Sequence, residues 1–120
     1  MRAVVFTEYG PPEVLHLKEV EKPVPKDDEI LIRIHATVVT RTDTSIRGLP
    51  MKGNRKTRKQ VCLGTYLAGE VEAVGKRAKR FKVGDKVFGG GKLVGGCYSE
   101  YKCLPERRAV FPMPSHLTYE

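Results

Sequence analysis

Apolar and polar residues alternate along two stretches of the chain, and this alternation predicts two half-buried β-strands. In residues 29–37 the residues that share one face are Ile30, Ile32, Ile34 and Ala36. In residues 63–75 the shared face holds Leu67, Gly69, Val71 and Ala73, while Glu70 and Glu72 point to the other face. We expect the remaining elements to be arranged around these two strands.

Shorter segments with strand character are separated by glycine and proline. They are residues 2–7, residues 14–20 at a sheet edge, residues 97–104 and residues 110–111. Residues 81–89 form the partner of the 63–75 strand across a charged connection, with a turn at Gly84 and Asp85. Glycine also marks the changes of direction at Gly64 and Gly75, because it reaches positive φ without steric cost.

Other segments lose the alternation. Residues 49–60 are polar and basic, which predicts a loop, and the glycine runs at 89–91 and 95–96 predict hairpin ends. These runs do not match a phosphate-binding loop, because no Gly-Lys-Ser/Thr sequence and no helical pattern accompany them.

Two segments have helical signals. Residues 40–48 predict a short helical turn, capped by Thr40 or Thr42 and ended at Gly48. Residues 115–120 resemble the opening of a helix. Many short strands with almost no helix predict a mainly β fold, a partly open β-barrel with one or two short helical turns.

The length of 120 residues suits a single domain. The apolar run at residues 3–6 is too short for a signal peptide, and no stretch reaches transmembrane length. The three cysteines, Cys62, Cys97 and Cys103, form no paired spacing, which favours a reducing compartment. We therefore expect a cytoplasmic protein without a membrane partner, in which the cysteines act as small core residues.

The formal net charge is +8. Much of the excess comes from two basic clusters: Lys52, Arg55, Lys56, Arg58 and Lys59, and then Lys76, Arg77, Lys79, Arg80 and Lys82. Such runs are typical of solvated loops, and a phosphate-binding surface is the alternative. The three histidines, His16, His35 and His116, share no metal-ligand spacing and are expected at the surface or half-buried.

Four segments together carry a resemblance to a known family. They are Arg2-Ala3-Val4-Val5, residues 63–71 (LGTYLAGEV), residues 81–89 (FKVGDKVFG) and Ser99-Glu100-Tyr101. The chain resembles, over essentially its whole length, the N-terminal GroES-like domain of the medium-chain dehydrogenase/reductase (alcohol dehydrogenase) superfamily. Within this superfamily it is similar to the zinc-independent quinone oxidoreductases. The resemblance implies a GroES-like fold for residues 1–120.

The resemblance also bears on zinc. Zinc-dependent members carry a catalytic Cys before an Arg-Ser/Thr-Asp segment and a Gly-His-Glu sequence, and the matching positions here are Thr40, Thr65 and Tyr66. Threonine and tyrosine are not the ligands that a catalytic zinc site uses. Cys97 and Cys103 have no partner pair that would make a structural zinc lobe. We expect no zinc.

For zinc-independent relatives the resemblance implies hydride transfer from NADPH to a quinone or an enone, an activated alkene. It places Thr40, Asp43, Ser45, Thr65 and Tyr66 at the substrate and cofactor cleft and assigns no catalytic residue. Relatives often have Asn at the position of Thr40 and Tyr at that of Ser45. Thr40 and Asp43 could equally be plain helix caps, and Tyr66 could be a packed aromatic residue rather than a proton donor.

No Gly-x-Gly-x-x-Gly turn occurs in the sequence, so we expect the Rossmann domain of such an enzyme to lie beyond residue 120. The chain would then be a domain fragment or a truncated gene product, the substrate-side domain of an NADPH-dependent oxidoreductase, without catalysis of its own. The alternative is a stand-alone GroES-like binding module. A further hypothesis is single-stranded nucleic-acid binding through the basic clusters, weakened by salt and by neutralising Lys56, Arg58 and Lys59.

Overall fold

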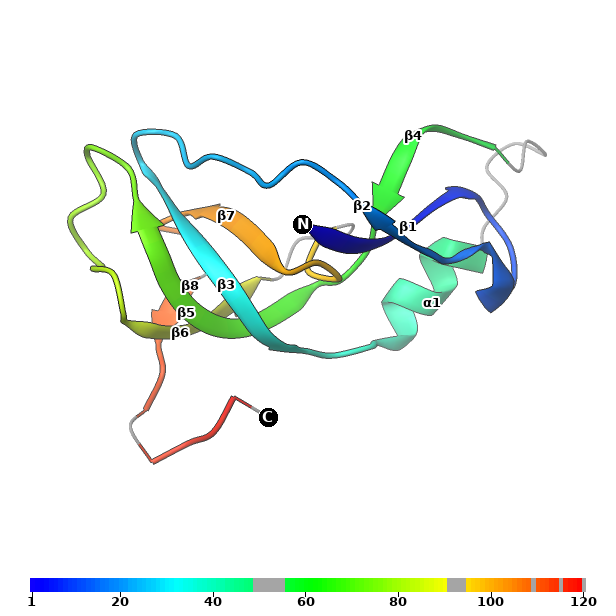
Figure 1. Ribbon diagram of the computed structural model, residues 1–120. Helices are drawn as coiled ribbons and strands as arrows, with labels where there is room; N and C mark the ends of the chain where they lie inside the picture. Colours follow the sequence, from blue (N-terminus) through cyan, green and yellow to red (C-terminus); the bar gives the residue numbers. More distant parts are fainter. Residues whose placement is uncertain (49–55, 91–94, 109, 115, 120) are drawn as a thin grey trace.

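The computed structural model describes residues 1–48, 56–90, 95–108, 110–114 and 116–119, and the side chains of all of these except 56–59. The elements are β1 (Arg2–Glu8), η1 (Pro12–Val14), β2 (His16–Glu19), β3 (Glu29–Thr37), α1 (Arg41–Gly48), β4 (Lys56–Cys62), β5 (Tyr66–Val74), β6 (Lys86–Gly90), β7 (Tyr101–Pro105) and β8 (Val110–Pro112). They form a curled, five-stranded half-barrel and a smaller three-stranded sheet, with α1 at one end of the molecule (Figure 1). The predicted mainly β fold, a partly open barrel with short helical turns, is confirmed.

The five-stranded sheet has the order β7-β3-β5-β6-β8, and its centre is the antiparallel pair β3 and β5. Ile30 and Ile32 on β3 and Leu67 and Val71 on β5 are buried, as the alternation predicted. Burying each such side chain stabilises the fold by about 1.5–3 kcal/mol. The register shifts twice along this pair, and such β-bulges bend strands, which suits the curl of the sheet.

The three-stranded sheet has the order β2-β1-β4, so β2 lies at an edge, as predicted. The prediction of a loop over residues 49–60 was wrong for residues 56–60. These residues belong to β4, where Lys56 pairs with Glu8 of β1. Pairing of this kind uses main-chain groups, so it tolerates a polar edge sequence that shows no alternation. The preceding residues, 49–55, lie outside the described part of the chain.

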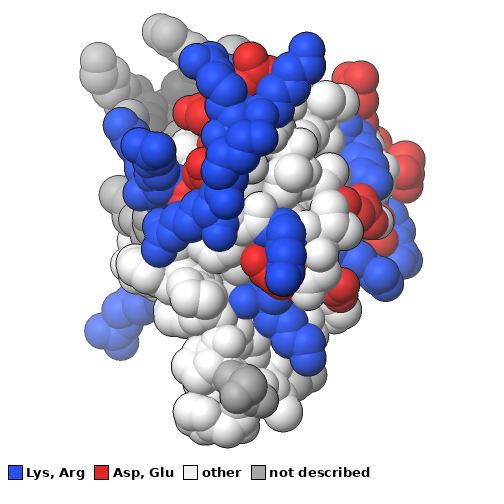
Figure 2. Space-filling model, turned by 90° about the vertical axis from the view of Figure 1, so that its left-hand side faces the viewer, with Lys and Arg blue, Asp and Glu red and all other residues white. Residues whose placement is uncertain are grey.

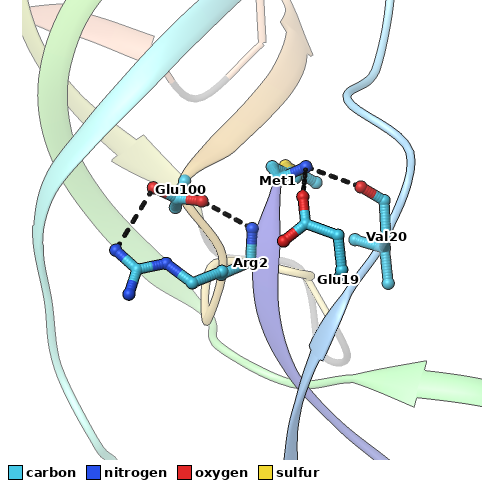
Figure 3. Close-up of polar contacts among 5 residues, drawn as sticks. All are labelled: Met1, Arg2, Glu19, Val20 and Glu100. Atoms are coloured by element: carbon cyan, nitrogen blue, oxygen red, sulfur yellow. Dashed lines mark hydrogen bonds and ion pairs between the residues drawn. The ribbon is translucent and has the colours of Figure 1, made fainter.

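Residues 97–100 join the two sheets. The Val4 amide donates to the carbonyl oxygen of Tyr98 at 2.8 Å, and the Ile34 amide donates to that of Glu100 at 2.8 Å. The Glu100 carboxylate accepts from the Arg2 amide at 2.5 Å and lies 3.7 Å from its guanidinium (Figure 3). In the same view the Met1 amino group contacts Glu19 and the carbonyl oxygen of Val20. The predicted 97–104 strand therefore begins only at Tyr101, because the preceding residues bridge between sheets.

Two glycines in the connection that follows β5 are required by the backbone. Gly84 has φ +96°, a left-handed conformation that favours glycine, as the turn prediction expected. Gly75 has a different reason, because a Cβ there would lie 2.1 Å from the carbonyl oxygen of Lys26. The strand predicted from Phe81 starts only at Lys86, since residues 81–85 form this turn.

The helical predictions had different outcomes. Helix α1 forms where it was expected, and η1 is a single turn before β2. The C-terminal helix is not formed at residues 116–119, where Tyr119 instead stacks on His35 with ring centroids 4.3 Å apart. None of the helices within the described ranges is long and apolar enough to cross a membrane.

Basic side chains gather at the end of the molecule away from α1, with acidic side chains among them (Figure 2). The second basic cluster, residues 76–82, lies here and its Lys and Arg side chains are exposed, as expected for a solvated loop. Glu106 is buried beneath it and accepts hydrogen bonds from the amides of Lys79 and Arg80 at 3.1 and 2.8 Å. The side chains of the first cluster lie outside the described set, so nucleic-acid binding through them stays a prediction.

Candidate functional site

The candidate site begins where β3 leads into α1, and Thr40 caps this helix. The Asp43 amide donates to Oγ1 of Thr40 at 3.2 Å. In return, Oδ2 of Asp43 accepts from the Thr40 amide at 3.2 Å and from the Thr40 hydroxyl at 2.8 Å. A short polar residue at the cap and a carboxylate three residues later satisfy the free amides of a helix start in this reciprocal way. The capping role that the sequence allowed for both residues is therefore present.

Asp43 does more than cap the helix, because its side chain is 1% exposed and bridges distant segments. Oδ1 accepts a 3.0 Å hydrogen bond from the hydroxyl of Thr65, which lies in the turn before β5 and is 5% exposed. Oδ2 accepts a 3.1 Å hydrogen bond from the hydroxyl of Tyr98. The carboxylate thus ties together α1, the start of β5 and the 97–100 segment.

These hydrogen bonds determine whether the Asp43 carboxyl group is ionised. Burial alone would raise the pKa of Asp43, but the hydrogen bonds from Thr40, Thr65 and Tyr98 outweigh it and lower the pKa below its ordinary value of 3.8. Burial and the adjacent Asp43 carboxylate raise the pKa of Tyr98 to about 12. At neutral pH Asp43 is therefore ionised and Tyr98 is a protonated donor.

The direction of these hydrogen bonds limits what the hydroxyls can do. An ionised carboxylate only accepts, so the hydroxyl protons of Thr40, Thr65 and Tyr98 are all directed at Asp43. Each hydroxyl oxygen keeps lone pairs with which it can accept a hydrogen bond. The cluster is consequently an arrangement of acceptors rather than of proton donors.

Tyr66 and Ser45 stand apart from this cluster. Tyr66 begins β5 with half of its surface exposed, and none of the hydrogen bonds among the described residues involves its hydroxyl. Its ring lines a cavity of about 220 Å³, whose other walls come from Ala36, Thr37, Val38, Leu67, Ala68 and Tyr119. Ser45 is exposed on α1. The structure thus brings together Thr40, Asp43 and Thr65, and their role at a cleft stays a prediction, as does that of Tyr66 and Ser45.

Tyr98 is the member of the cluster that sequence reasoning missed. The sequence placed it only within the predicted 97–104 strand, and no local pattern links it to Asp43, 55 residues earlier. Its ring also lines an apolar groove of about 540 Å³ between the two sheets. Only the tertiary fold reveals this contact.

The donor set does not fit a zinc ion. No group of three or more His, Cys, Asp or Glu side chains is placed to hold a metal within the described ranges. The oxygens of Asp43 are already engaged with three hydroxyls. Burial raises the pKa of Cys62, and it raises the pKa of Cys97 and of Cys103 to about 11, which disfavours the thiolate form that binds metals.

The residues fit only part of a dinucleotide. The start of α1 is unfavourable for a pyrophosphate, because the Thr40 amide already donates to Asp43, the Asp43 amide donates to Oγ1 of Thr40, and the buried Asp43 carboxylate would repel a phosphate. The exposed Tyr66 ring and its cavity could instead contact a flat ring, either a nicotinamide or a substrate.

Comparison with known proteins gives one consistent result. The family described as the alcohol dehydrogenase GroES-like domain matches residues 26–115. Quinone oxidoreductase of Homo sapiens is 40% identical over 121 residues, and the match covers 100% of this chain and 36% of that protein. The chloroplastic quinone-oxidoreductase homolog of Spinacia oleracea is 33% identical over 116 residues, covering 95% of this chain and 35% of that protein.

A solved structure agrees with these relatives. The quinone oxidoreductase of Escherichia coli complexed with NADPH superimposes with a TM-score of 0.84 at 28% identity, covering 99% of this chain and 35% of that chain. The present chain therefore spans about a third of the length of the relatives it matches.

Proposed function

Because the chain belongs to the alcohol dehydrogenase GroES-like domain family, we propose that it is the substrate-side domain of an NADPH-dependent oxidoreductase that reduces quinones or activated alkenes without zinc. The observation that carries this proposal is the buried cluster around Asp43. It has hydroxyls, from Thr40 and Thr65, at two of the positions where the zinc-dependent branch has metal ligands. The complex of the E. coli relative with NADPH supports the choice of cofactor.

In this proposal NADPH, when bound, supplies the hydride, and the residues of this chain bind and orient the substrate. Asp43 fixes the Thr40 and Thr65 hydroxyls with their protons directed at its carboxylate, so their free lone pairs can accept from a ligand group that donates, such as the carboxamide of a nicotinamide, but not from a quinone oxygen. Tyr66 presents a half-exposed ring beside the 220 Å³ cavity, and its hydroxyl can donate a proton to a carbonyl oxygen. Ser45 is exposed on α1, where a ligand can reach it.

The proposal assigns the phosphate-binding part of the cofactor site to a Rossmann domain outside these 120 residues. The sequence has no glycine-rich dinucleotide turn, and the relatives are about three times longer than the matched region. The isolated chain is therefore expected to bind NADPH weakly and to lack catalysis.

A binding experiment tests the substrate side directly. Tetramethyl-1,4-benzoquinone has no free ring position for addition of cysteine thiols, so it can be titrated into the ¹⁵N-labelled chain. We expect amide shift changes confined to the residues of the cavity around Tyr66, to Thr40, Ser45 and Thr65, and to their neighbours, and we expect the Tyr66→Ala variant to lose those at the cavity. Shift changes elsewhere, or none at saturating quinone, would contradict the assignment of the cleft.

A further inference from the structure

The main chain of Tyr98 is held on two sides. Its amide donates to the carbonyl oxygen of Leu63 at 3.0 Å, and its carbonyl oxygen accepts from the Val4 amide at 2.8 Å. Two residues later, Glu100 is fixed to Arg2 (Figure 3), and its carbonyl oxygen accepts from the Ile34 amide. Tyr98 therefore projects from a segment anchored to both sheets, so the position of its Cα atom is fixed.

The side chain of Tyr98 connects this anchored segment to the start of α1. Its hydroxyl lies 3.1 Å from Oδ2 of Asp43 and 3.4 Å from the carbonyl oxygen of Val38, in the segment between β3 and α1. The bonds from Thr40 to Asp43 are local to the helix start, whereas Thr65 and Tyr98 each approach from a distant segment. One distant hydroxyl thus faces each carboxylate oxygen, which fixes the plane of the carboxylate.

We propose that Tyr98 is a positioning residue, whose hydroxyl fixes the Asp43 carboxylate and through it the Thr40 and Thr65 hydroxyls that the proposed function assigns to the ligand cleft. Removing the Tyr98 hydroxyl leaves Oδ2 with the Thr40 bonds only, so the carboxylate can turn about its χ2 angle and the Thr65 bond to Oδ1 loosens. The part of this inference that concerns substrate rests on the proposed function, and the part that concerns Asp43 does not.

The ionisation of both groups agrees with this role. Because the pKa of Tyr98 is raised to about 12, the phenol remains a donor over the whole physiological range. Its hydrogen bond is one of those that lower the pKa of Asp43. Loss of this bond is therefore expected to raise the pKa of Asp43.

A spectroscopic titration of the 120-residue chain tests the first part. The side-chain carboxyl ¹³C shift of Asp43 is followed against pH in the wild-type chain, in Tyr98→Phe and in Tyr101→Phe. Tyr101 is the matched control, because its hydroxyl donates to Glu72 at 3.3 Å and not to Asp43. We expect a higher Asp43 midpoint in Tyr98→Phe and an unchanged midpoint in Tyr101→Phe. Equal midpoints in Tyr98→Phe and wild type would overturn the inference.

If Tyr98→Phe does not fold, the exchange of the Tyr98 hydroxyl proton with solvent is compared between the wild-type chain and Asp43→Asn instead. A slowly exchanging Tyr98 hydroxyl proton that is lost in Asp43→Asn supports the bond, and a freely exchanging one overturns it.

The second part needs activity, for which residues 1–120 replace the matched third of the E. coli quinone oxidoreductase. In this chimera Tyr98→Phe should shift the acid limb of the kcat/KM pH profile upward, with Tyr101→Phe unchanged. An unmoved acid limb in an active chimera overturns the positioning role. An inactive parent chimera instead contradicts the proposed function, while the ¹³C titration still decides whether Tyr98 holds Asp43.

Discussion

The Thr65 hydroxyl donates a 3.0 Å hydrogen bond to Oδ1 of Asp43, across 22 positions of sequence, and both side chains are buried. This bond connects the start of β5 to the first turn of α1. A buried acceptor that loses its donor keeps the full cost of its desolvation. The stability of the domain should therefore depend on this hydroxyl.

Thr65→Val keeps the side-chain shape and removes the hydroxyl, so it should lower the free energy of unfolding by about 1–3 kcal/mol. Thr65→Ser keeps the hydroxyl and is the matched control, with a smaller loss that comes from the missing methyl group. Urea denaturation followed by circular dichroism measures both. Equal stabilities for Thr65→Val and wild type would show that the bond contributes nothing.

Asp43 also makes stability depend on pH. Although burial opposes its charge, its hydrogen bonds keep the pKa in the folded chain below the ordinary value of 3.8. The unfolded chain therefore takes up this proton more readily. The stabilisation is complete above the ordinary aspartate pKa and is lost as the pH falls through the lower, folded value.

The comparison of wild type with Asp43→Asn isolates this effect, because other carboxylates titrate in both proteins. We expect the wild type to be the more stable near pH 6 and the difference in urea midpoint to shrink in acid, below the ordinary aspartate range. A difference that is constant with pH would mean that Asp43 titrates alike in the folded and unfolded chain.

Gly75→Ala should destabilise the domain, because the new Cβ would lie 2.1 Å from the carbonyl oxygen of Lys26 and 2.5 Å from that of Asp27. Both neighbours are backbone atoms, so the connection between β2 and β3 must shift, at a cost of about 1–3 kcal/mol. Gly48→Ala is the matched control, because a Cβ there meets nothing within 4 Å. In thermal unfolding we expect a lower Tm for Gly75→Ala and an unchanged or higher Tm for Gly48→Ala.

Tyr66→Phe separates a chemical from a structural role of this residue. The ring is half exposed and begins a strand, so stability should change by less than about 0.5 kcal/mol. In the chimera with the E. coli relative, loss of the hydroxyl should lower kcat by on the order of 10²-fold if it donates a proton. An unchanged kcat would exclude proton donation by Tyr66 and leave only its ring as a lining residue of the cavity.

The strands at the centre of the fold could be predicted from sequence, because one face of each is buried. Ile30 and Ile32 on β3 and Leu67 and Val71 on β5 lie where the alternation placed them. β4 could not be predicted in the same way. Its first residues, from Lys56, pair through main-chain groups, which leave no apolar pattern in the sequence.

Within the candidate site, only the contact between Thr40 and Asp43 could be predicted, because it is local in the sequence. Thr40 and Asp43 are close in sequence and carry the signature of a helix start, which the chain shows directly. The contact of Asp43 with Tyr98 depends on how the 97–100 segment bridges the two sheets, and no local pattern encodes such a long-range contact. The sequence explained the glycine at position 75 by positive φ, which was wrong. The real reason is crowding by the carbonyl oxygen of Lys26, and this contact is also nonlocal.

The chimera of residues 1–120 with the remaining two-thirds of the E. coli quinone oxidoreductase tests the central claim most directly. The measurement is NADPH oxidation with a quinone as acceptor, in the presence and absence of a zinc chelator. We predict quinone-dependent turnover that the chelator leaves unchanged. A folded chimera that binds NADPH but reduces no quinone or enone, or that loses its activity to the chelator, would contradict the account.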